Sequence, residues 1–155
     1  WRSLSNEYWN GFTVGVQGTA AEILNQPPDC STAAPSVASL WPPNHKFHSI
    51  AVNGVTDPDG DTVAITVDSI FQDESVNGAG DGDTSPDGLG VGSSTAQVRA
   101  ERSGQGNGRV YHISYTADDG NGGICSGEVL VGVPHDQGKG STPVDGGALH
   151  DSTTS

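Results

Sequence analysis

The stretch Val55-Thr56-Asp57-Pro58-Asp59-Gly60-Asp61-Thr62 runs directly into Val63-Ala64-Ile65-Thr66-Val67. The second half alternates in a way that predicts a β-strand with one buried face. The first half places three carboxylates, Asp57, Asp59 and Asp61, around a proline and a glycine. Such residues form ordinary solvated turns. Three anions this close also repel one another unless a cation lies between them, and Ca²⁺ takes about six to eight oxygen ligands. Both interpretations of the loop are open at this point.

The composition favours short strands joined by turns. The chain has 155 residues, of which 23 are Gly and 9 are Pro, and only 32% are hydrophobic. This length is sufficient for one domain with a core of its own. Because long helix-forming runs are absent, we expect an all-β fold.

The net charge of −13, from 19 acidic and 6 basic residues, makes nucleic acid an unfavourable partner. Nucleic acid binding requires a basic surface, so we expect none. We likewise expect no membrane insertion, because no stretch approaches the ~20 apolar residues of a membrane-spanning helix. An acidic surface fits a secreted protein in calcium-bearing surroundings, although acidity can also serve solubility alone.

Six strands are expected at residues 37–40, 46–52, 62–71, 95–102, 109–117 and 124–133. Strands of this length and spacing are typical of an immunoglobulin-like Greek-key β-sandwich. The sequence thus divides into an N-terminal segment, 1–29, a sandwich, 30–133, and a polar C-terminal tail, 134–155.

The flanking segments and the longest loop differ in character. Residues 1–29 are rich in aromatic side chains, and Thr19-Ala20-Ala21-Glu22 matches a capping box that predicts a short helix at 20–25. The 72–94 excursion contains Asp81, Asp83 and Asp87, which form a further candidate cation site. The tail is polar, and we expect it to be held by this domain or by another subunit.

The expected topology brings distant features together. In an antiparallel sandwich of this kind the loops 54–61 and 118–123 lie at the same end, which places Asp118, Asp119 and Asn121 beside the first acidic loop. Cys30 and Cys125 meet at that end too. We therefore expect a long-range disulfide formed in an oxidising compartment, the alternative being two free buried thiols.

Two motifs carry a resemblance to a known class of domain. Thr56-Asp57-Pro58-Asp59-Gly60-Asp61-Thr62, together with Thr116-Ala117-Asp118-Asp119-Gly120-Asn121-Gly122-Gly123, resembles the bacterial calcium-binding Ig-like and cadherin-like modules of secreted and surface proteins. The segment Leu40-Trp41-Pro42-Pro43-Asn44-His45-Lys46 is similar to the opening of such modules. The resemblance covers about residues 35–133. It implies calcium ligands at Asp57, Asp59 and Asp61 first, and at Asp118, Asp119 and Asn121 second.

The sequence therefore predicts a non-catalytic, calcium-stabilised module for adhesion or assembly at the bacterial cell surface or in a filament. The terminal segments are expected to contact other copies of the chain. The start at Trp1, with no signal peptide, leads us to expect a processed or truncated form. No G-x-S-x-G or H-E-x-x-H motif indicates catalysis. The alternative is an accessory carbohydrate-binding domain of a secreted enzyme, with Trp1, Tyr8 and Trp9 stacking on a polysaccharide.

Overall fold

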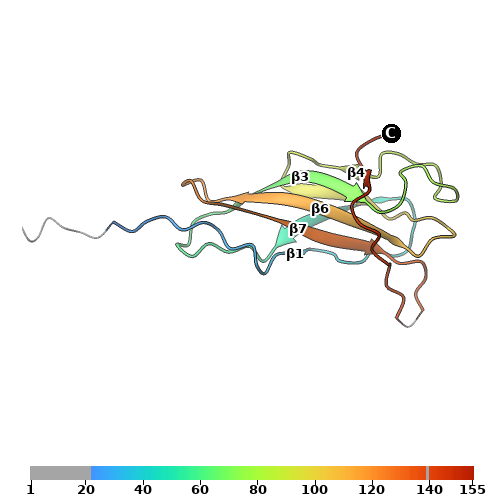
Figure 1. The fold of residues 1–155 in the computed structure, drawn as a ribbon, viewed down its shortest axis with the longest axis horizontal. Helices are drawn as coiled ribbons and strands as arrows, with labels where there is room; N and C mark the ends of the chain where they lie inside the picture. Colours follow the sequence, from blue (N-terminus) through green and yellow to red (C-terminus); the bar gives the residue numbers. More distant parts are fainter. Residues whose placement is uncertain (1–21, 139) are drawn as a thin grey trace, which may run out of the picture.

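The structure, a computed structural model, describes residues 22–138 and 140–155. Over these residues the protein is all-β, with two antiparallel sheets of four strands each, stacked as a sandwich (Figure 1). The described residues form no helix, so none of them belongs to a helix that could cross a membrane. The prediction of an all-β sandwich is confirmed.

The first sheet has the strand order β1-β2-β5-β4. Its main pair is β2 (Phe47–Asn53) with β5 (Thr95–Arg99), in a register that runs from Phe47–Arg99 to Ala51–Thr95. Two-residue strands flank this pair: β1 (Ala34–Pro35) on β2 and β4 (Gly88–Leu89) on β5.

The second sheet has the order β7-β6-β3-β8. Its three long strands are β3 (Ala64–Gln72), β6 (Arg109–Asp118) and β7 (Ile124–Val133). The β6–β7 ladder is unbroken from Arg109–Val133 to Asp118–Ile124. A two-residue strand, β8 (His150–Asp151), pairs with the end of β3.

The core lies between the sheets and follows the predicted alternation. On β6, Tyr111, Ile113, Tyr115 and Ala117 are all buried. On β5 and just after it, Ala96, Val98 and Ala100 are buried too. Burial of these apolar side chains is the main stabilising contribution to the sandwich.

A β-bulge changes the face that β3 presents to the core. The register with β6 shifts between Val67 and Ser69. As a result Val67 and Ile70, three residues apart, are both buried. One extra residue in a strand reverses the side to which the following side chains point.

Two expected elements differ in the structure. Residues 37–40 form no regular strand: Ser39 makes a parallel bridge to Gly132, and β1 lies earlier, at Ala34–Pro35. The helix expected at 20–25 is not found over residues 22–25, and residues 20 and 21 lie outside the described part. Asn25 and Gln26 instead donate hydrogen bonds to acidic side chains of the sandwich, and Pro27-Pro28 cannot extend a helix.

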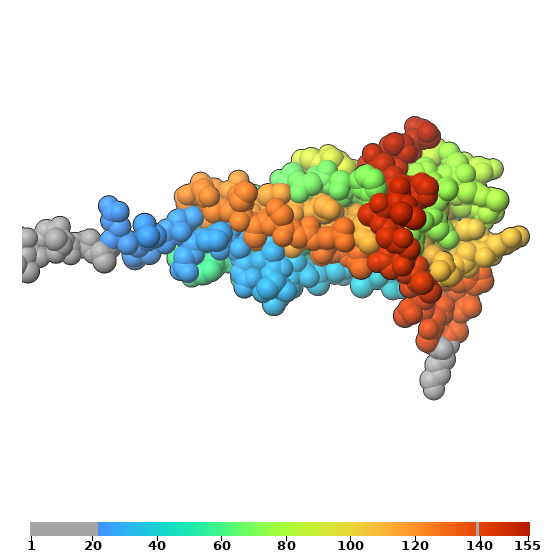
Figure 2. Space-filling model, viewed as in Figure 1, coloured from blue at the N-terminus to red at the C-terminus, as the bar shows by residue number. Residues whose placement is uncertain are grey.

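The C-terminal segment packs on its own sandwich. We call residues 141–153 the strap, because Figure 2 shows this end of the chain lying across the strands at the end of the molecule opposite residues 22–29. The backbone N–H of Leu149 donates to the carbonyl of Gln72, and that of Ser152 to the carbonyl of Ile70. The Ser152 carbonyl accepts from the N–H groups of Asp87 and Gly88. The strap thus bridges β3 of one sheet and β4 of the other.

Candidate metal site at the acidic end of the sandwich

The candidate metal site is the loop between β2 and β3. Asp57, Asp59 and Asp61 each offer a carboxylate oxygen, and these oxygens lie within 4.8 Å of one another. Asp57 Oδ1 accepts hydrogen bonds from the backbone N–H of Asp59 at 2.8 Å and of Asp61 at 3.2 Å. Gly60 has a φ of 83°, which a residue with a side chain rarely adopts. The loop therefore folds around the Asp57 carboxylate, and the three carboxylates that the sequence suggested as cation ligands lie close together.

The second oxygen of Asp57 is the unusual atom of this cluster. Asp57 Oδ2 is buried and has no hydrogen-bond partner in the protein. A buried carboxylate oxygen without a partner carries an uncompensated desolvation cost. A cation held by the three carboxylates would supply the missing interaction, and hard oxygen donors suit Ca²⁺ or Mg²⁺.

The N-terminal segment contacts this loop directly. Gln26 donates to both oxygens of Asp59, from its backbone N–H to Oδ2 at 2.6 Å and from its side-chain amide to Oδ1 at 3.2 Å. Asp29 pairs with Thr56 through two backbone hydrogen bonds of 2.7 and 3.2 Å. The chain entering the sandwich is thereby fastened to the acidic loop.

The second acidic loop, 118–123, lies beside the first but has a different role. Asn121 Nδ2 donates to Asp61 Oδ2 at 2.9 Å, which joins the two loops. Asp119 Oδ1 accepts from the N–H groups of Asn121 and Gly123, and its Oδ2 accepts from Asn25 at 2.8 Å. The hydrogen bond from Asn25 and those from the loop backbone lower the pKa of Asp119 below its usual value.

The structure thus brings the two loops together as predicted, without placing all six candidates around one point. Among the described residues, the group able to hold a metal comprises Asp57, Asp59 and Asp61 only. Asp119 organises its own loop, and Asp118 accepts from the N–H of Gly120 at 2.7 Å. Asn121 reaches the site as a hydrogen-bond donor to Asp61.

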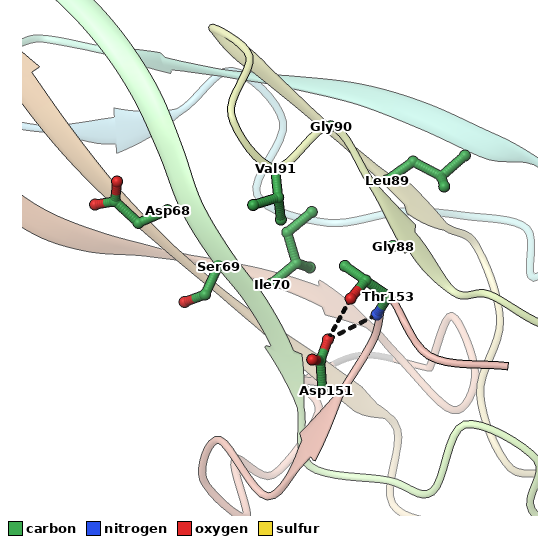
Figure 3. Close-up of a pocket in the computed structure, with 9 residues that line it drawn as sticks. All are labelled: Asp68, Ser69, Ile70, Gly88, Leu89, Gly90, Val91, Asp151 and Thr153. Carbon is green, nitrogen blue, oxygen red and sulfur yellow. Dashed lines mark hydrogen bonds between the residues drawn. The ribbon is translucent and has the colours of Figure 1, made fainter.

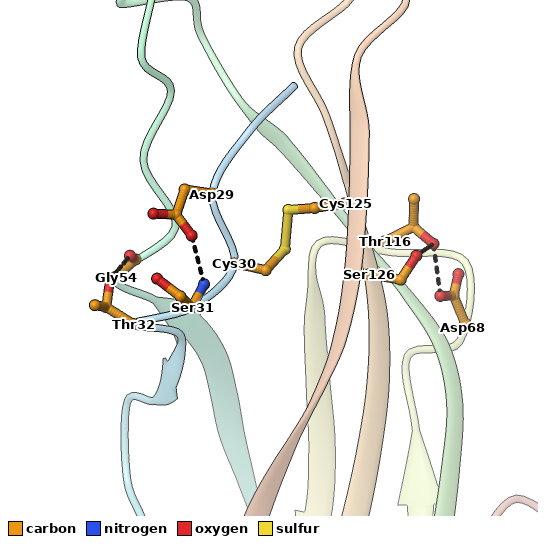
Figure 4. The surroundings of a disulfide bond; sticks show 9 residues. All are labelled: Asp29, Cys30, Ser31, Thr32, Gly54, Asp68, Thr116, Cys125 and Ser126. Carbon is orange, nitrogen blue, oxygen red and sulfur yellow. Dashed lines mark hydrogen bonds between the residues drawn. A yellow bond between two sulfur atoms is a disulfide. The ribbon is translucent and has the colours of Figure 1, made fainter. Parts of the chain in front are cut away.

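A disulfide closes the same end of the molecule. Cys30 and Cys125 are bonded, with a Cα–Cα separation of 6.0 Å, and Figure 4 shows the bond between the segment that precedes β1 and the start of β7. The predicted pairing is confirmed. Because Cys30 follows Asp29, the disulfide anchors the segment that pairs with Thr56, just before the carboxylate loop.

The third predicted group, Asp81, Asp83 and Asp87, is not brought around one point. Asp87 is buried and accepts hydrogen bonds on Oδ2 from Arg109 at 2.7 Å and from Gln72 at 2.8 Å. Asp81 is also buried, and its carboxylate accepts from the N–H groups of Gly78 and Asp83. Asp87 therefore faces a guanidinium, a position unfavourable for an additional cation.

Arg109 is the centre of a charged network that the sequence did not reveal. Its fully buried guanidinium lies 2.7 Å from Asp87, 3.3 Å from Glu74 and 3.8 Å from Asp81. Burial raises the pKa of Asp87, although Arg109 opposes the shift. Glu101, also fully buried, accepts from His45 at 2.9 Å. This network holds the long loop after β3 against the sandwich.

A groove lies between β3, β4 and the C-terminal end of the strap. Figure 3 shows the side chains of Ile70 and Val91 pointing toward one another in it, with Asp151 and Thr153 nearby. The carboxylate of Asp151 accepts from the N–H and hydroxyl of Thr153 at 2.9 and 2.7 Å. The groove carries no cluster of catalytic side chains among these residues.

No protein-family model, no curated protein and no solved structure matches the chain.

Proposed function

We propose that this protein is a non-catalytic, calcium-stabilised, immunoglobulin-like module of a secreted bacterial protein, located at the cell surface or in a filament. The observation that carries the proposal is the carboxylate cluster of Asp57, Asp59 and Asp61, with the partnerless buried oxygen of Asp57. Calcium is the cation of choice because it accepts irregular, all-oxygen coordination and is supplied outside the cell.

The strand order supports the immunoglobulin-like assignment. Constant-type immunoglobulin domains have sheets with the orders A-B-E-D and C-F-G. Here β1-β2-β5-β4 corresponds to the first order and β3-β6-β7 to the second, with β8 added at the edge. Such sandwiches serve many functions, so the fold alone does not select one.

The disulfide supports the secreted location, since disulfides persist in oxidising compartments and are rare in the cytosol.

Assembly with other copies is supported by the N-terminal segment. Ile23 and Leu24 are 90% and 77% exposed, and large apolar side chains on an extended segment are typical of contact sites. The strap packs on its own sandwich, so we place self-association at the N-terminal segment.

Carbohydrate binding has weaker support. Trp1, Tyr8 and Trp9, the predicted stacking residues, lie outside the described residues. Within the described part, Trp41 is the only aromatic residue among the exposed large hydrophobic ones. Sugar-binding surfaces are usually built from several such rings, so the structural role is preferred.

Calorimetric titration with CaCl₂ tests the proposal. We expect binding at millimolar calcium or below, and a higher melting temperature with calcium than with EDTA. Asp57→Asn should weaken binding, because Asn keeps the acceptor for the Asp59 and Asp61 amides but removes the charge. Asp68→Asn, which removes a carboxylate on β3 outside the cluster, is the matched control and should bind like the native protein. An absence of calcium binding by the native chain at millimolar concentrations would refute the metal site.

Light scattering on the same samples tests self-association. We expect particles larger than the monomer, and Ile23→Ser with Leu24→Ser should reduce their size. A strict monomer both with calcium and with EDTA would contradict the assembly role while leaving the metal site standing.

A further inference from the structure

His112 lies where the strap crosses the second sheet. It is on β6, and its ring is largely buried, with the residue 7% exposed. Nδ1 lies 3.0 Å from Glu128 Oε1 on β7, and Nε2 lies 2.9 Å from Asp145 Oδ1 on the strap. One imidazole thus connects the sheet to the strap through both nitrogens.

The protonation state of the ring decides whether both contacts are favourable. Two carboxylates only accept hydrogen bonds, so both ring nitrogens must donate, which only the imidazolium can do. A neutral ring donates from one nitrogen and faces the other carboxylate with a lone pair. The geometry therefore favours the charged ring when the strap is closed.

Among the described residues, the other carboxylates near these elements are held by partners of their own. From β3, the residue paired with His112 is Phe71. Asp73, just after β3, is occupied by the N–H groups of Val110 and Gly146, and Asp151 on β8 by Thr153. Glu128 and Asp145 are the carboxylates that contact the ring.

We propose that His112, Glu128 and Asp145 form a pH-sensitive latch that holds the strap across the sheet. With the latch closed, β8 covers the edge of β3, and Ser152 joins β3 to β4. With the latch open, the carbonyls of Ile70 and Gln72 at that edge lose their partners on the strap. Exposed strand edges are the usual sites of pairing with another chain.

The direction of the pH effect follows from the ring's surroundings. Burial lowers the pKa of His112, but the hydrogen bonds to Glu128 and Asp145 outweigh it, so the pKa lies above the ordinary value of 6.5. When the pKa of a histidine is higher in the folded than in the unfolded state, its charged form stabilises the fold. This stabilisation is complete below the unfolded-state pKa and disappears as the pH rises through the folded-state pKa. The latch is therefore closed below pH 6.5 and opens as the pH rises through the folded-state pKa of His112.

Amide hydrogen exchange of the full chain tests this, with the Leu149 and Ser152 amides as reporters and rates corrected for the intrinsic effect of pH. We expect their protection to fall as the pH rises from below 6.5 through the folded-state pKa of His112, because the contribution of the charged ring to strap stability is lost over that range. Asp145→Asn should abolish this pH dependence, because an amide can accept from the charged ring or donate to the neutral one. His112 ring signals in NMR should show a lower pKa in that variant.

His135→Gln and His150→Gln serve as matched controls. His135 precedes the strap and lies against Gly104, and His150 is on the strap opposite Gln72, so neither substitution changes a residue of the latch. Both should retain the native pH dependence. Constant protection of Leu149 and Ser152 in the native chain would overturn the proposal. So would an Asp145→Asn variant with the native pH dependence, even if the pKa of His112 proved to be raised.

Discussion

Arg109 is the residue whose removal we expect to cost the most stability, because it compensates several buried carboxylates at once. Arg109→Met keeps much of the side-chain volume but leaves Asp87 and Asp81 without their guanidinium. Removing one partner of a buried ion pair typically costs about 3–5 kcal/mol. Urea unfolding should report a loss of this size in the free energy of unfolding.

Lys46→Gln provides the matched control for Arg109→Met. It removes one positive charge from an exposed side chain, so its effect should stay within about 0.5 kcal/mol. Equal effects of the two substitutions would show that net charge, rather than the buried network, determines the loss.

Residue-level prediction from the sequence succeeded where the relevant contacts are local. Asp57, Asp59 and Asp61 come together because a tight loop brings alternate residues close. The partners of Arg109 lie on a long loop, and the spacing of Glu74 and Asp87 in the sequence gives no sign that they share one cation. Alternation along β6 puts His112 on the face opposite Tyr111, where the strap covers it.

At the scale of elements, the packing of the strap on β7 yields a prediction about Gly132. A Cβ at this position would lie 2.6 Å from Cγ of Pro143, so Gly132→Ala must displace the strap. We expect hydrogen exchange at the Val144 and Leu149 amides to accelerate by an amount equivalent to about 1–3 kcal/mol, the usual cost of overpacking. The β6–β7 ladder should keep its protection.

Gly127→Ala is the matched control on the same strand. Its Cβ would lie 2.6 Å from the hydroxyl of Tyr115, a similar clash directed away from the strap. Exchange at Val144 and Leu149 should then remain native. Acceleration of these amides in both variants would indicate that the strap responds to general destabilisation of β7.

Long strands could be predicted from the sequence because alternation over many residues is a strong signal. The expected 124–133 strand coincides with β7, and the expected 109–117 strand falls one residue short of β6. The strands β1, β4 and β8 have two residues each, too few to show any period. The expected strand at 37–40 was misplaced: in this stretch Ser39 forms a single bridge to the distant Gly132, and the regular strand β1 lies at Ala34–Pro35.

For the molecule as a whole, antiparallel connectivity was sufficient to place two loops and two cysteines at one end. Each strand reverses the direction of the previous one, so loop positions follow from the strand count once the sandwich is assumed. The path of the strap follows no such rule. It depends on Pro143 meeting Gly132 and on Asp145 meeting His112, contacts that no local pattern encodes.

The end of the molecule where the disulfide and the two acidic loops meet leads to a prediction that links the disulfide to the proposed calcium site. Replacing both cysteines, Cys30→Ser with Cys125→Ser, should lower the free energy of unfolding by about 2–5 kcal/mol. It should also weaken calcium binding by roughly tenfold, a typical coupling between sites. The reason is that Cys30 holds Asp29 against Thr56, and a freer segment must be ordered again when the cation binds. Calorimetry on the folded variant measures the affinity, and unchanged affinity alongside reduced stability would show that the carboxylate loop is independent of the crosslink.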